Sequence, residues 1–343
     1  MSDRMSYRDA GVDLDAAERA KDGLKDLVAS TRDRFTLSEL GAFGGLYQVP
    51  DDLKGPVLVS SADGVGTKLK LGFASNRHDT VGQCLVNHCV NDILVQGARP
   101  LFFLDYLATG EMDEAVVNDV VRGVAIACRE NSCALLGGET AQMPEFYAAD
   151  EYDLAGFIVG AVERDAIIDG SQIRAGQTLV GIESSGMHTN GYTLARKIVF
   201  DRMGLGVEDE YPGTGHSVGE EMLAIHRSYA PLFLPLLADG VSIRGLAHVT
   251  GGGIPGNLPR VLPEGLGARV DRSSWEVPAT FQTLQDGGNV TRDEMDRVFN
   301  MGIGMIAVVD EDGADAIRGA ADTAGLASYV IGQIEDGEGV SYS

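Results

Sequence analysis

The chain has 343 residues, of which 44% are hydrophobic, and a formal net charge of −24 at pH 7. This length allows two domains, each with its own core. The negative charge would repel a nucleic-acid backbone and no basic stripe offsets it, which excludes DNA and RNA as expected partners. No window holds eighteen apolar residues and the first twenty residues are charged throughout, so we expect no membrane span, no secretory signal and a cytoplasmic location.

The first half predicts alternating helices and strands. We expect an opening helix at about 15–31, a glycine-rich crossing at 41–45, and a strand that starts at Pro56 and ends at Asp63. Apolar residues recur on one face of the next helix, at 80–96, as they do on a helix packed against a sheet. A strand at 101–107, a helix at 114–128, and strands at 134–136 and 155–162 complete this half. Such alternation indicates an α/β or α+β fold.

The segment 163–177 is polar and rich in turn residues, which is typical of a domain boundary. We therefore expect an N-terminal domain at 1–168 and a C-terminal domain at 169–343. The predicted elements of the second half are a strand at 178–182, helices at 192–203 and 219–237, a glycine loop at 250–253, a strand at 303–309, a helix at 314–324 and a strand at 328–334.

The segment Ser60-Ser61-Ala62-Asp63-Gly64-Val65-Gly66-Thr67-Lys68 combines the residue types of a phosphate and metal site. Glycine turns tightly and presents bare N–H groups to an anion. Lysine contacts phosphate as a point charge, and a carboxylate holds the Mg²⁺ that accompanies a nucleotide. The spacing fits neither a P-loop nor a dinucleotide fingerprint. A strand followed by a plain glycine turn is the alternative.

The predicted helix at 80–96 carries polar residues on one side of an apolar stripe. Asn87 and Asn91 share one face, and His88 and Asp92 share the next, because residues four apart are neighbours on a helix. One interpretation is a solvent-facing surface with two amides. The other is that Asp92 joins Asp63 around a metal.

A second strand ends in Gly137-Gly138-Glu139, so two strand ends share the pattern of glycine and acid. Ligands of open sheets bind beyond the carboxyl ends of strands. Mg²⁺ prefers hard oxygen ligands, which makes Glu139 a candidate third carboxylate beside Asp63 and Asp92.

The second half contains two segments that pair a histidine with small residues. One holds His188 and Asn190, and the other holds His248 before Thr250, Gly251, Gly252 and Gly253. Three glycines ahead of a helix start predict an anion-binding loop, with a flexible connector as the alternative. A histidine near a mobile proton serves in acid–base catalysis, or it only hydrogen-bonds a carbonyl.

Four cysteines, at 84, 89, 128 and 133, are spaced differently from zinc knuckles and redox dithiols. Cys84 and Cys89 lie in an apolar helical stretch, where we expect small buried hydrophobic residues.

These motifs, in this order, resemble those of the phosphoribosylformylglycinamidine cyclo-ligase (AIR synthetase) family. The matching segments are 7–13, 63–68, 90–92, 100–106, 137–144, 184–192 and 248–253. The resemblance spans about residues 7–334. Ala62 stands where the family usually has threonine and Met187 where it usually has proline, and neither change removes a reactive group.

The resemblance implies a homodimer of two-domain chains, in which N-terminal strands of both protomers form a β-barrel and the C-terminal domain is α/β. It implies ring closure of formylglycinamidine ribonucleotide to aminoimidazole ribonucleotide in purine biosynthesis, with ATP hydrolysed to ADP and phosphate. Mg²⁺ and commonly K⁺ are the expected cofactors.

The resemblance also implies roles for single residues. Asp63 and Asp92 would hold Mg²⁺, with Glu139 as a third ligand or a substrate contact. Lys25, Gly64, Gly66, Thr67 and Lys68 would contact ATP, and His188, Asn190 and the loop Thr250, Gly251, Gly252 and Gly253 would face the substrate. Asp92, Lys68 and His248 are the expected catalytic residues, with His248 moving the proton.

Two alternatives to this function stay open, of which the second belongs to another functional class. One is a different ATP-dependent phosphotransferase of the same superfamily, such as selenophosphate synthetase or thiamine-monophosphate kinase. Selenophosphate synthetases usually carry a reactive Cys near the N-terminus, whereas the first cysteine here is Cys84. The other is a homologue that binds ATP without turnover.

Overall fold

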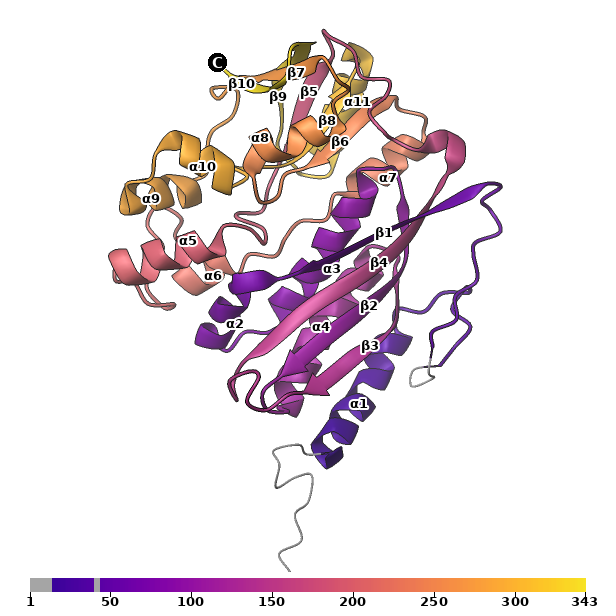
Figure 1. The fold of residues 1–343 in the computed structure, drawn as a ribbon, viewed down its shortest axis with the longest axis vertical. Helices are drawn as coiled ribbons and strands as arrows, with labels where there is room; N and C mark the ends of the chain where they lie inside the picture. Colours follow the sequence, from indigo (N-terminus) through magenta and orange to yellow (C-terminus); the bar gives the residue numbers. More distant parts are fainter. Residues whose placement is uncertain (1–13, 40–43) are drawn as a thin grey trace, which may run out of the picture.

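The computed structural model describes residues 14–39 and 44–343. The motif at 7–13 and residues 41–43 of the predicted glycine-rich crossing lie outside these ranges. Two mixed sheets with flanking helices follow one another along the chain and lie one above the other in Figure 1. The predicted α/β class is therefore confirmed. Within the described residues no helix has both the length and the apolar content to cross a membrane.

The first sheet has four strands in the order β1-β4-β2-β3, in which only β2 and β3 pair in parallel. Its strands are β1 (Pro56–Gly64), β2 (Arg99–Thr109), β3 (Ala134–Gln142) and β4 (Tyr152–Glu163). One face is covered by α3 (Asp79–Leu94) and α4 (Glu114–Glu130), and α1 (Leu14–Ala29) packs against α4 and β3. The Asp113 carboxylate starts α4 by accepting the N–H groups of Ala115 and Val116.

The opposite face of the first sheet carries exposed apolar side chains. Leu58 on β1 is 58% exposed and Phe157 on β4 is 48% exposed. Side chains alternate between the faces of a strand, so these residues point away from α3, whereas Ser61 and Asp63 point toward it. Among the residues that the structure describes, these apolar side chains on this face stay exposed.

The second sheet has six strands in the order β10-β7-β9-β5-β8-β6. Its strands are β5 (Thr178–Glu183), β6 (Ile243–His248), β7 (Leu266–Val270), β8 (Ile303–Val309), β9 (Ser328–Asp336) and β10 (Gly339–Tyr342). The remaining α-helices are α2 (Leu69–Ser75), α5 (Tyr192–Arg196), α6 (Val218–Met222), α7 (Ala230–Ala238), α8 (Gly253–Asn257), α9 (Ala279–Gly288), α10 (Arg292–Val298) and α11 (Glu311–Thr323). Single turns of other helix types occur at Gly66–Lys68, Arg164–Ala166, Lys197–Arg202 and Leu258–Val261.

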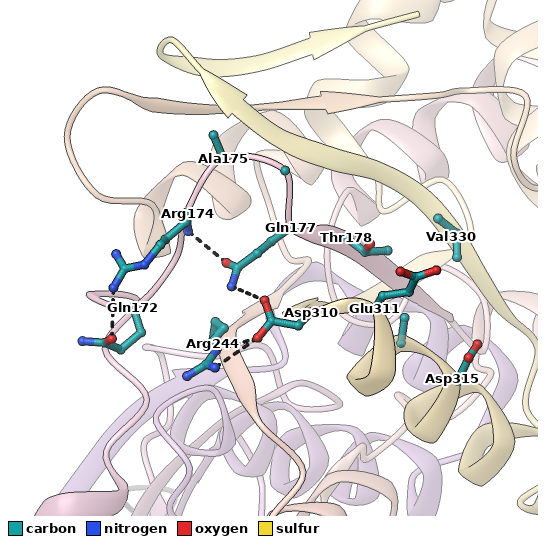
Figure 2. Close-up of a pocket in the computed structure, with 12 residues that line it drawn as sticks. Gln172, Arg174, Ala175, Gln177, Thr178, Arg244, Asp310, Glu311, Asp315 and Val330 are labelled. Atoms are coloured by element: carbon teal, nitrogen blue, oxygen red, sulfur yellow. Dashed lines mark hydrogen bonds and ion pairs between the residues drawn. The ribbon is translucent and has the colours of Figure 1, made fainter.

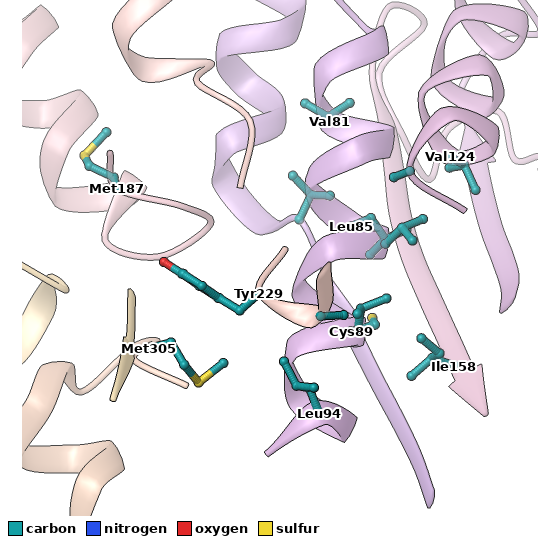
Figure 3. Packing of buried hydrophobic residues seen from close by; sticks show 14 of the residues in the cluster. Val81, Leu85, Cys89, Leu94, Val124, Ile158, Met187, Tyr229 and Met305 are labelled. Carbon is teal, nitrogen blue, oxygen red and sulfur yellow. The ribbon is translucent and has the colours of Figure 1, made fainter. Parts of the chain in front are cut away.

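One hydrophobic core runs through both sheet units. It includes Leu85 and Cys89 on α3, Ile158 on β4, and Tyr229 and Met305 from the second half (Figure 3). A second core lies on the other side of the six-stranded sheet, around Trp275, Ile306 and Ile331. Because α3 packs against the first sheet and also against α7 and β6, it is buried almost all round and fixes the two units relative to each other.

The structure corrects several predicted boundaries. The helix expected at 219–237 is two short helices, α6 and α7, because side chains of α3 bind the backbone of residues 224–229 between them. The strand expected at 134–136 continues to Gln142, so Glu139 lies within β3 and not in a loop after it. Sequence patterns did not predict β6, β7, β10, α9 or α10, since these elements are short and weakly periodic.

All four cysteines are buried free thiols, which confirms the prediction made for Cys84 and Cys89.

Candidate active site

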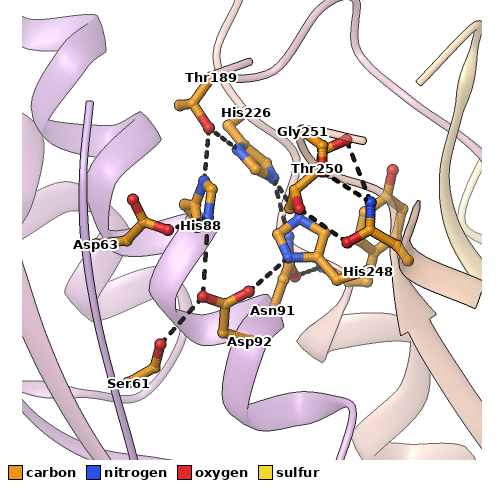
Figure 4. Close-up of polar contacts among 12 residues, drawn as sticks. Ser61, Asp63, His88, Asn91, Asp92, Thr189, His226, His248, Thr250 and Gly251 are labelled. Atoms are coloured by element: carbon orange, nitrogen blue, oxygen red, sulfur yellow. Dashed lines mark hydrogen bonds and ion pairs between the residues drawn. The ribbon is translucent and has the colours of Figure 1, made fainter. Parts of the chain in front are cut away.

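A cluster of histidines and carboxylates lies where α3 meets the second sheet unit (Figure 4). Asp63 comes from the end of β1, and His88 and Asp92 come from one face of α3. His248 comes from the end of β6. His226 comes from the link between α6 and α7 and contacts His248. Four segments that are distant in sequence therefore converge here.

The two carboxylates converge on a single imidazole. His88 Nε2 lies 2.8 Å from Asp63 Oδ2 and 3.8 Å from Asp92 Oδ2. The Asp63 and Asp92 side chains keep 42% and 26% of their surface exposed, whereas the His88 side chain is buried. Two ionised, partly solvated carboxylates that face the same imidazole are candidate ligands of a divalent cation. We call Asp63, His88, Asp92 and His248 the rim cluster.

Charge pairing sets the protonation of the rim cluster. Burial raises the pKa of Asp63, but the hydrogen bond and charge of His88 act more strongly together, so the pKa of Asp63 is lowered. Burial pulls the pKa of His88 down, yet Asp63 and Asp92 outweigh it and the pKa is raised. The pKa of Asp92 is also lowered, because its bonds to His248 and Ser61 offset the effect of burial. Both carboxylates are ionised at neutral pH.

His248 is oriented by Asp92. Its Nδ1 lies 2.9 Å from Asp92 Oδ1, and its Nε2 lies 3.1 Å from Nε2 of His226. Burial lowers the pKa of His248, although Asp92 opposes that effect. A neutral His248 that donates its Nδ1–H to Asp92 keeps an Nε2 lone pair that can take up a proton, and this nitrogen faces His226.

A hydroxyl links the remaining histidines. Thr189 Oγ1 lies 2.5 Å from His88 Nδ1 and 3.3 Å from His226 Nδ1. The His188 ring stacks on His226 with centroids 3.9 Å apart, and its Nε2 accepts the N–H of Ser185. Burial lowers the pKa of His188 and of His226 well below the usual value, so both rings are neutral. His188, predicted to face the substrate, is thus part of the buried packing.

Lys68 lies in a buried position and not at an open phosphate site. Its side chain is fully buried, and Nζ donates to the carbonyls of His188 at 2.8 Å and Ala224 at 2.6 Å. Nζ also lies 3.1 Å from Cys84 Sγ. These partners belong to both sheet units, so in this arrangement Lys68 joins the two halves. Its predicted contact with ATP stays a prediction.

The two amides on α3 are buried, so their interpretation as a solvent-facing surface is wrong. Asn87 Nδ2 donates to the carbonyl of His226 at 2.8 Å. Asn91 donates to the carbonyl of Arg227 and accepts the N–H of Tyr229. These bonds hold the link between α6 and α7 in the extended path that brings His226 into the cluster.

The glycine segment after Asp63 leaves backbone groups near the rim cluster. The Gly64 N–H binds the Asp63 carboxylate at 2.6 Å. Gly66 has φ +64°, which a side chain would strain, and the space beside it is open. Thr67 is exposed and its hydroxyl lies 2.9 Å from that of Thr193. Gly66 and Thr67 are accessible to a ligand.

Glu139 and Lys25 lie apart from the rim cluster in one chain. Asp63, Gly156, Asp105 and Gly138 form one row across the sheet, and Glu139 follows Gly138. Three strand spacings, roughly 14 Å, thus separate the strand of Glu139 from Asp63. Lys25 is exposed on α1, which packs against α4 and β3. Glu139 is therefore too far from Asp63 to be a third metal ligand within one chain. Its other predicted role, as a substrate contact, stays a prediction.

The two predicted substrate loops meet each other. Asn190 Oδ1 lies against Gly251, where an added Cβ would come within 3.2 Å, and Asn190 Nδ2 is buried without a hydrogen-bond partner. In the glycine loop, Asn257 Nδ2 donates to the carbonyls of Thr250, Gly251 and Gly253. Gly252 and Gly253 have positive φ, and a Cβ on Gly253 would clash with the Asp296 carbonyl. The helix that follows, α8, has only five residues and contributes little dipole.

Sequence reasoning missed His226 and Thr189, and it placed His88 on the same helix face as Asp92 without giving it a role in the site. The chain has only six histidines, and this scarcity was the available signal that they could share one site. Four of them meet here: His88, His188, His226 and His248. No spacing rule links them, because they belong to four separate segments.

A cavity of about 700 Å³ lies elsewhere, beside α11 in the second unit (Figure 2). Its polar side chains satisfy one another: Asp310 accepts from Gln177 at 2.9 Å and from Arg244 at 3.0 Å. None of the predicted site residues lines it, so we place the active site at the rim cluster and not in this cavity.

Comparisons with known proteins agree with the sequence motifs. A family model described as AIR synthase related protein, N-terminal domain, matches residues 45–162, and its C-terminal counterpart matches residues 174–343. A curated protein of Sorangium cellulosum named phosphoribosylformylglycinamidine cyclo-ligase is 52% identical over 96% of this chain and 95% of its own length. One of the same name from Desulfitobacterium hafniense is 51% identical over 98% and 99%.

Solved structures share the fold at low identity. A thiamine-monophosphate kinase from Stenotrophomonas maltophilia aligns with TM-score 0.72 and 19% identity, over 94% of this chain and 96% of that one. The hydrogenase maturation protein HypE, solved in complex with ATP, aligns with TM-score 0.64 and 18% identity, over 90% and 84%. From the near-complete match to curated relatives and the two family models, the chain is a ligase of the phosphoribosylformylglycinamidine cyclo-ligase family.

Proposed function

We propose that this chain closes the imidazole ring of aminoimidazole ribonucleotide from formylglycinamidine ribonucleotide, with ATP hydrolysed to ADP and phosphate. The convergence of Asp63 and Asp92 on His88, beside the exposed backbone of Gly66 and Thr67, is the structural observation that supports it most directly. The names of its relatives, which match over nearly their whole length, favour this reaction over that of another phosphotransferase.

The chemistry requires an activated oxygen. The formamide oxygen is a poor leaving group, so it attacks the γ-phosphorus of ATP and ADP leaves, which gives an iminophosphate. The ribosyl-bearing nitrogen then attacks that carbon, the ring closes, and phosphate departs. Phosphoryl transfer needs neutralised charge, and ring closure needs the reacting ends held in near-attack geometry.

The rim cluster supplies oxygen ligands for a magnesium ion that accompanies ATP. Asp63 and Asp92 are ionised and partly exposed, and both approach His88 Nε2, at 2.8 and 3.8 Å, which fits the preference of Mg²⁺ for a few carboxylates with water and phosphate completing its shell. Bound there, Mg²⁺ would neutralise charge on the transferring phosphate. K⁺ is part of the proposal through the family resemblance alone.

His248 is the proposed proton carrier. Its Nε2 lone pair takes the proton that the attacking nitrogen loses, and Asp92 stabilises the imidazolium that forms. Asn190 and the loop from Thr250 to Gly253 are the proposed substrate contacts. The unpartnered Asn190 Nδ2 supports this role, because a buried donor without a partner costs free energy that a ligand would recover.

A homodimer is the proposed assembly. On one face of the first sheet, Leu58 and Phe157 stay exposed within the described part of the chain, and the four strands do not close into a barrel there. Covering this face with the same face of a second copy would bury this apolar surface and complete a barrel. Sedimentation velocity of the chain and of a Phe157→Asp variant tests this: we expect a dimer and a monomer, respectively, and a monomeric parent chain would contradict it.

The decisive assay supplies the full chain with formylglycinamidine ribonucleotide, ATP and Mg²⁺ and follows aminoimidazole ribonucleotide together with ADP. Equal amounts of both products are expected. ATP binding without either product would identify a non-catalytic homologue, and ADP formed without the imidazole would indicate a different phosphoryl acceptor.

A further inference from the structure

The link between α6 and α7, residues 224–229, is neither helix nor strand, so the hydrogen bonds of a regular element do not fix its path. Side chains from other segments bind every residue of it. The pairs are Lys68 Nζ with the carbonyl of Ala224, Ser185 Oγ with that of Ile225, Asn87 Nδ2 with that of His226, Asn91 Nδ2 with that of Arg227, Asn131 Oδ1 with Ser228 Oγ, and Asn91 Oδ1 with the N–H of Tyr229.

Three of these side chains form one directed chain of hydrogen bonds that leaves the link and returns to it. Ser228 Oγ donates to Asn131 Oδ1 at 2.5 Å, and Asn131 Nδ2 donates to Asn87 Oδ1 at 2.9 Å. Asn87 Nδ2 then donates to the carbonyl of His226 at 2.8 Å. Asn131 Nδ2 also donates to the carbonyl of Ala127 at 2.8 Å, which anchors the chain on the last turn of α4. We call Ser228, Asn131 and Asn87 the amide chain.

We propose that Asn131 and Ser228 are positioning residues, which hold the His226 ring against the nitrogen of His248 that carries the proton. The proposal rests on the proposed function, which gives His248 that role. His226 Nε2 lies 3.1 Å from His248 Nε2, and the amide chain fixes the backbone from which the His226 ring projects (Figure 4). Asn131 forms its bonds outside the rim cluster, so it acts on the site through His226.

Burial makes the amide chain demanding. The Asn87 and Asn131 side chains belong to residues only 4% and 5% exposed, and buried polar groups are costly unless each is bonded. A buried network that is fully bonded rigidifies the structure around it, whereas one with a missing member does not. Loss of the Ser228 hydroxyl therefore leaves the Asn131 oxygen without its donor and weakens the whole chain.

Packing does not hold the link on one side. A cavity of about 280 Å³ lies beside it, and its lining includes Asn87, Asn131, Ile225, His226, Ser228 and Pro231. Close-packed side chains would resist a shift of the link, but no side chain fills this space. Hydrogen bonds are thus what keeps the link in place here, and a broken amide chain lets His226 move.

The first test compares Ser228→Ala, which removes the hydroxyl, with Ser228→Thr, which keeps it and has the cavity beside it for the added methyl group. For Ser228→Ala we expect kcat to fall roughly 10- to 100-fold, because a misplacement of about 1 Å costs up to roughly 100-fold. The KM for ATP should change less than about 2-fold, since the nucleotide site is untouched. Ser228→Thr should restore most of the parent kcat. An unchanged kcat in Ser228→Ala, or an equal loss in Ser228→Thr, would overturn the proposal.

Asn131→Ala breaks the same chain at its middle. It should lower kcat as Ser228→Ala does, and the double variant should lower it no further, because both changes remove one interaction. Asn118→Ala is the matched control, since Asn118 Nδ2 on α4 also donates to the carbonyl four residues earlier, as Asn131 does at the end of that helix. The control should keep the parent kcat. Losses that add in the double variant would contradict a shared chain.

Hydrogen exchange followed by mass spectrometry examines the link without the reaction. Peptides that cover residues 224–229 should exchange faster in Ser228→Ala and Asn131→Ala than in the parent chain and in Asn118→Ala. Unchanged exchange there would overturn the proposal even if kcat falls. If Asn131→Ala does not fold, Ser228→Ala, at a half-buried position, decides both measurements. A parent chain that closes no ring refutes the proposed function instead, and the exchange rates still decide whether the amide chain holds the link.

Discussion

Asp63 and Lys68 stand five residues apart in one motif, yet they belong to regions with opposite properties. The rim cluster around Asp63 is partly open, acidic and close to exposed backbone groups. The region around Lys68 is closed, and its ammonium group is held by carbonyls from the second sheet unit. The motif therefore supplies the residue types. The packing around each end of the motif decides that Asp63 meets solvent and that Lys68 joins the two sheet units.

The largest effect is expected from the open region. Asp92→Asn keeps the side-chain shape and one oxygen that accepts the Nδ1–H of His248, but it replaces a charged metal ligand with a neutral amide. Turnover should fall roughly 100-fold or more, because metal-based charge stabilisation contributes several kcal/mol. Steady-state rates and urea unfolding measure activity and stability separately. Asp119→Asn, on the surface of α4, is the control, and an unchanged rate for Asp92→Asn would remove Asp92 from the site.

The second prediction separates chemistry from binding within the rim cluster. His248→Ala should lower kcat more than it weakens ATP binding, since Nε2 carries the proton in the proposed reaction. Single-turnover rates beside equilibrium ATP titration make the measurement. A loss confined to substrate affinity would assign His248 to binding instead.

In the closed region around Lys68, we expect a substitution to lower the stability of the fold. Lys68→Met keeps the apolar stem but leaves the carbonyls of His188 and Ala224 without their donor, so the free energy of unfolding should fall by about 2–4 kcal/mol. Urea denaturation measures it. Lys70→Met, at a half-exposed lysine paired with Glu151, should cost less than about 1 kcal/mol. Equal effects of the two substitutions would show that the buried Lys68 contacts contribute no more to the free energy of unfolding than the Lys70–Glu151 pair does.

Asp105, like Lys68, is a buried ionisable residue, but it is an acid and not a base. Burial raises the pKa of this β2 carboxyl to about 7. The folded chain therefore holds a proton that the unfolded chain releases near pH 4, and this contribution to stability is lost as pH rises from about 4 to about 7.

Asp105→Asn should remove that loss. The variant should gain stability relative to the parent chain between pH 5 and pH 8, by at most about 4 kcal/mol over the whole range of the shift. Urea midpoints of both chains at the two pH values give the difference. A constant offset between the chains would show that Asp105 stays ionised in the fold.

Much of this protein follows from its sequence alone. Acids and glycines after an apolar strand predicted the position of Asp63, and the spacing of His88 and Asp92 on a helix placed both on one face. Local periodicity also predicted the α/β class and the long helices, because these depend on contacts between residues close in sequence.

Only the tertiary structure brought His226 and His248 to α3 and closed the space around Lys68. Those positions depend on how the six-stranded sheet docks against α3, through bonds such as that of Asn87 to the carbonyl of His226. No local pattern encodes such contacts, since the partners, Asn87 with His226 and Asp92 with His248, lie more than a hundred residues apart and meet only when both cores have formed.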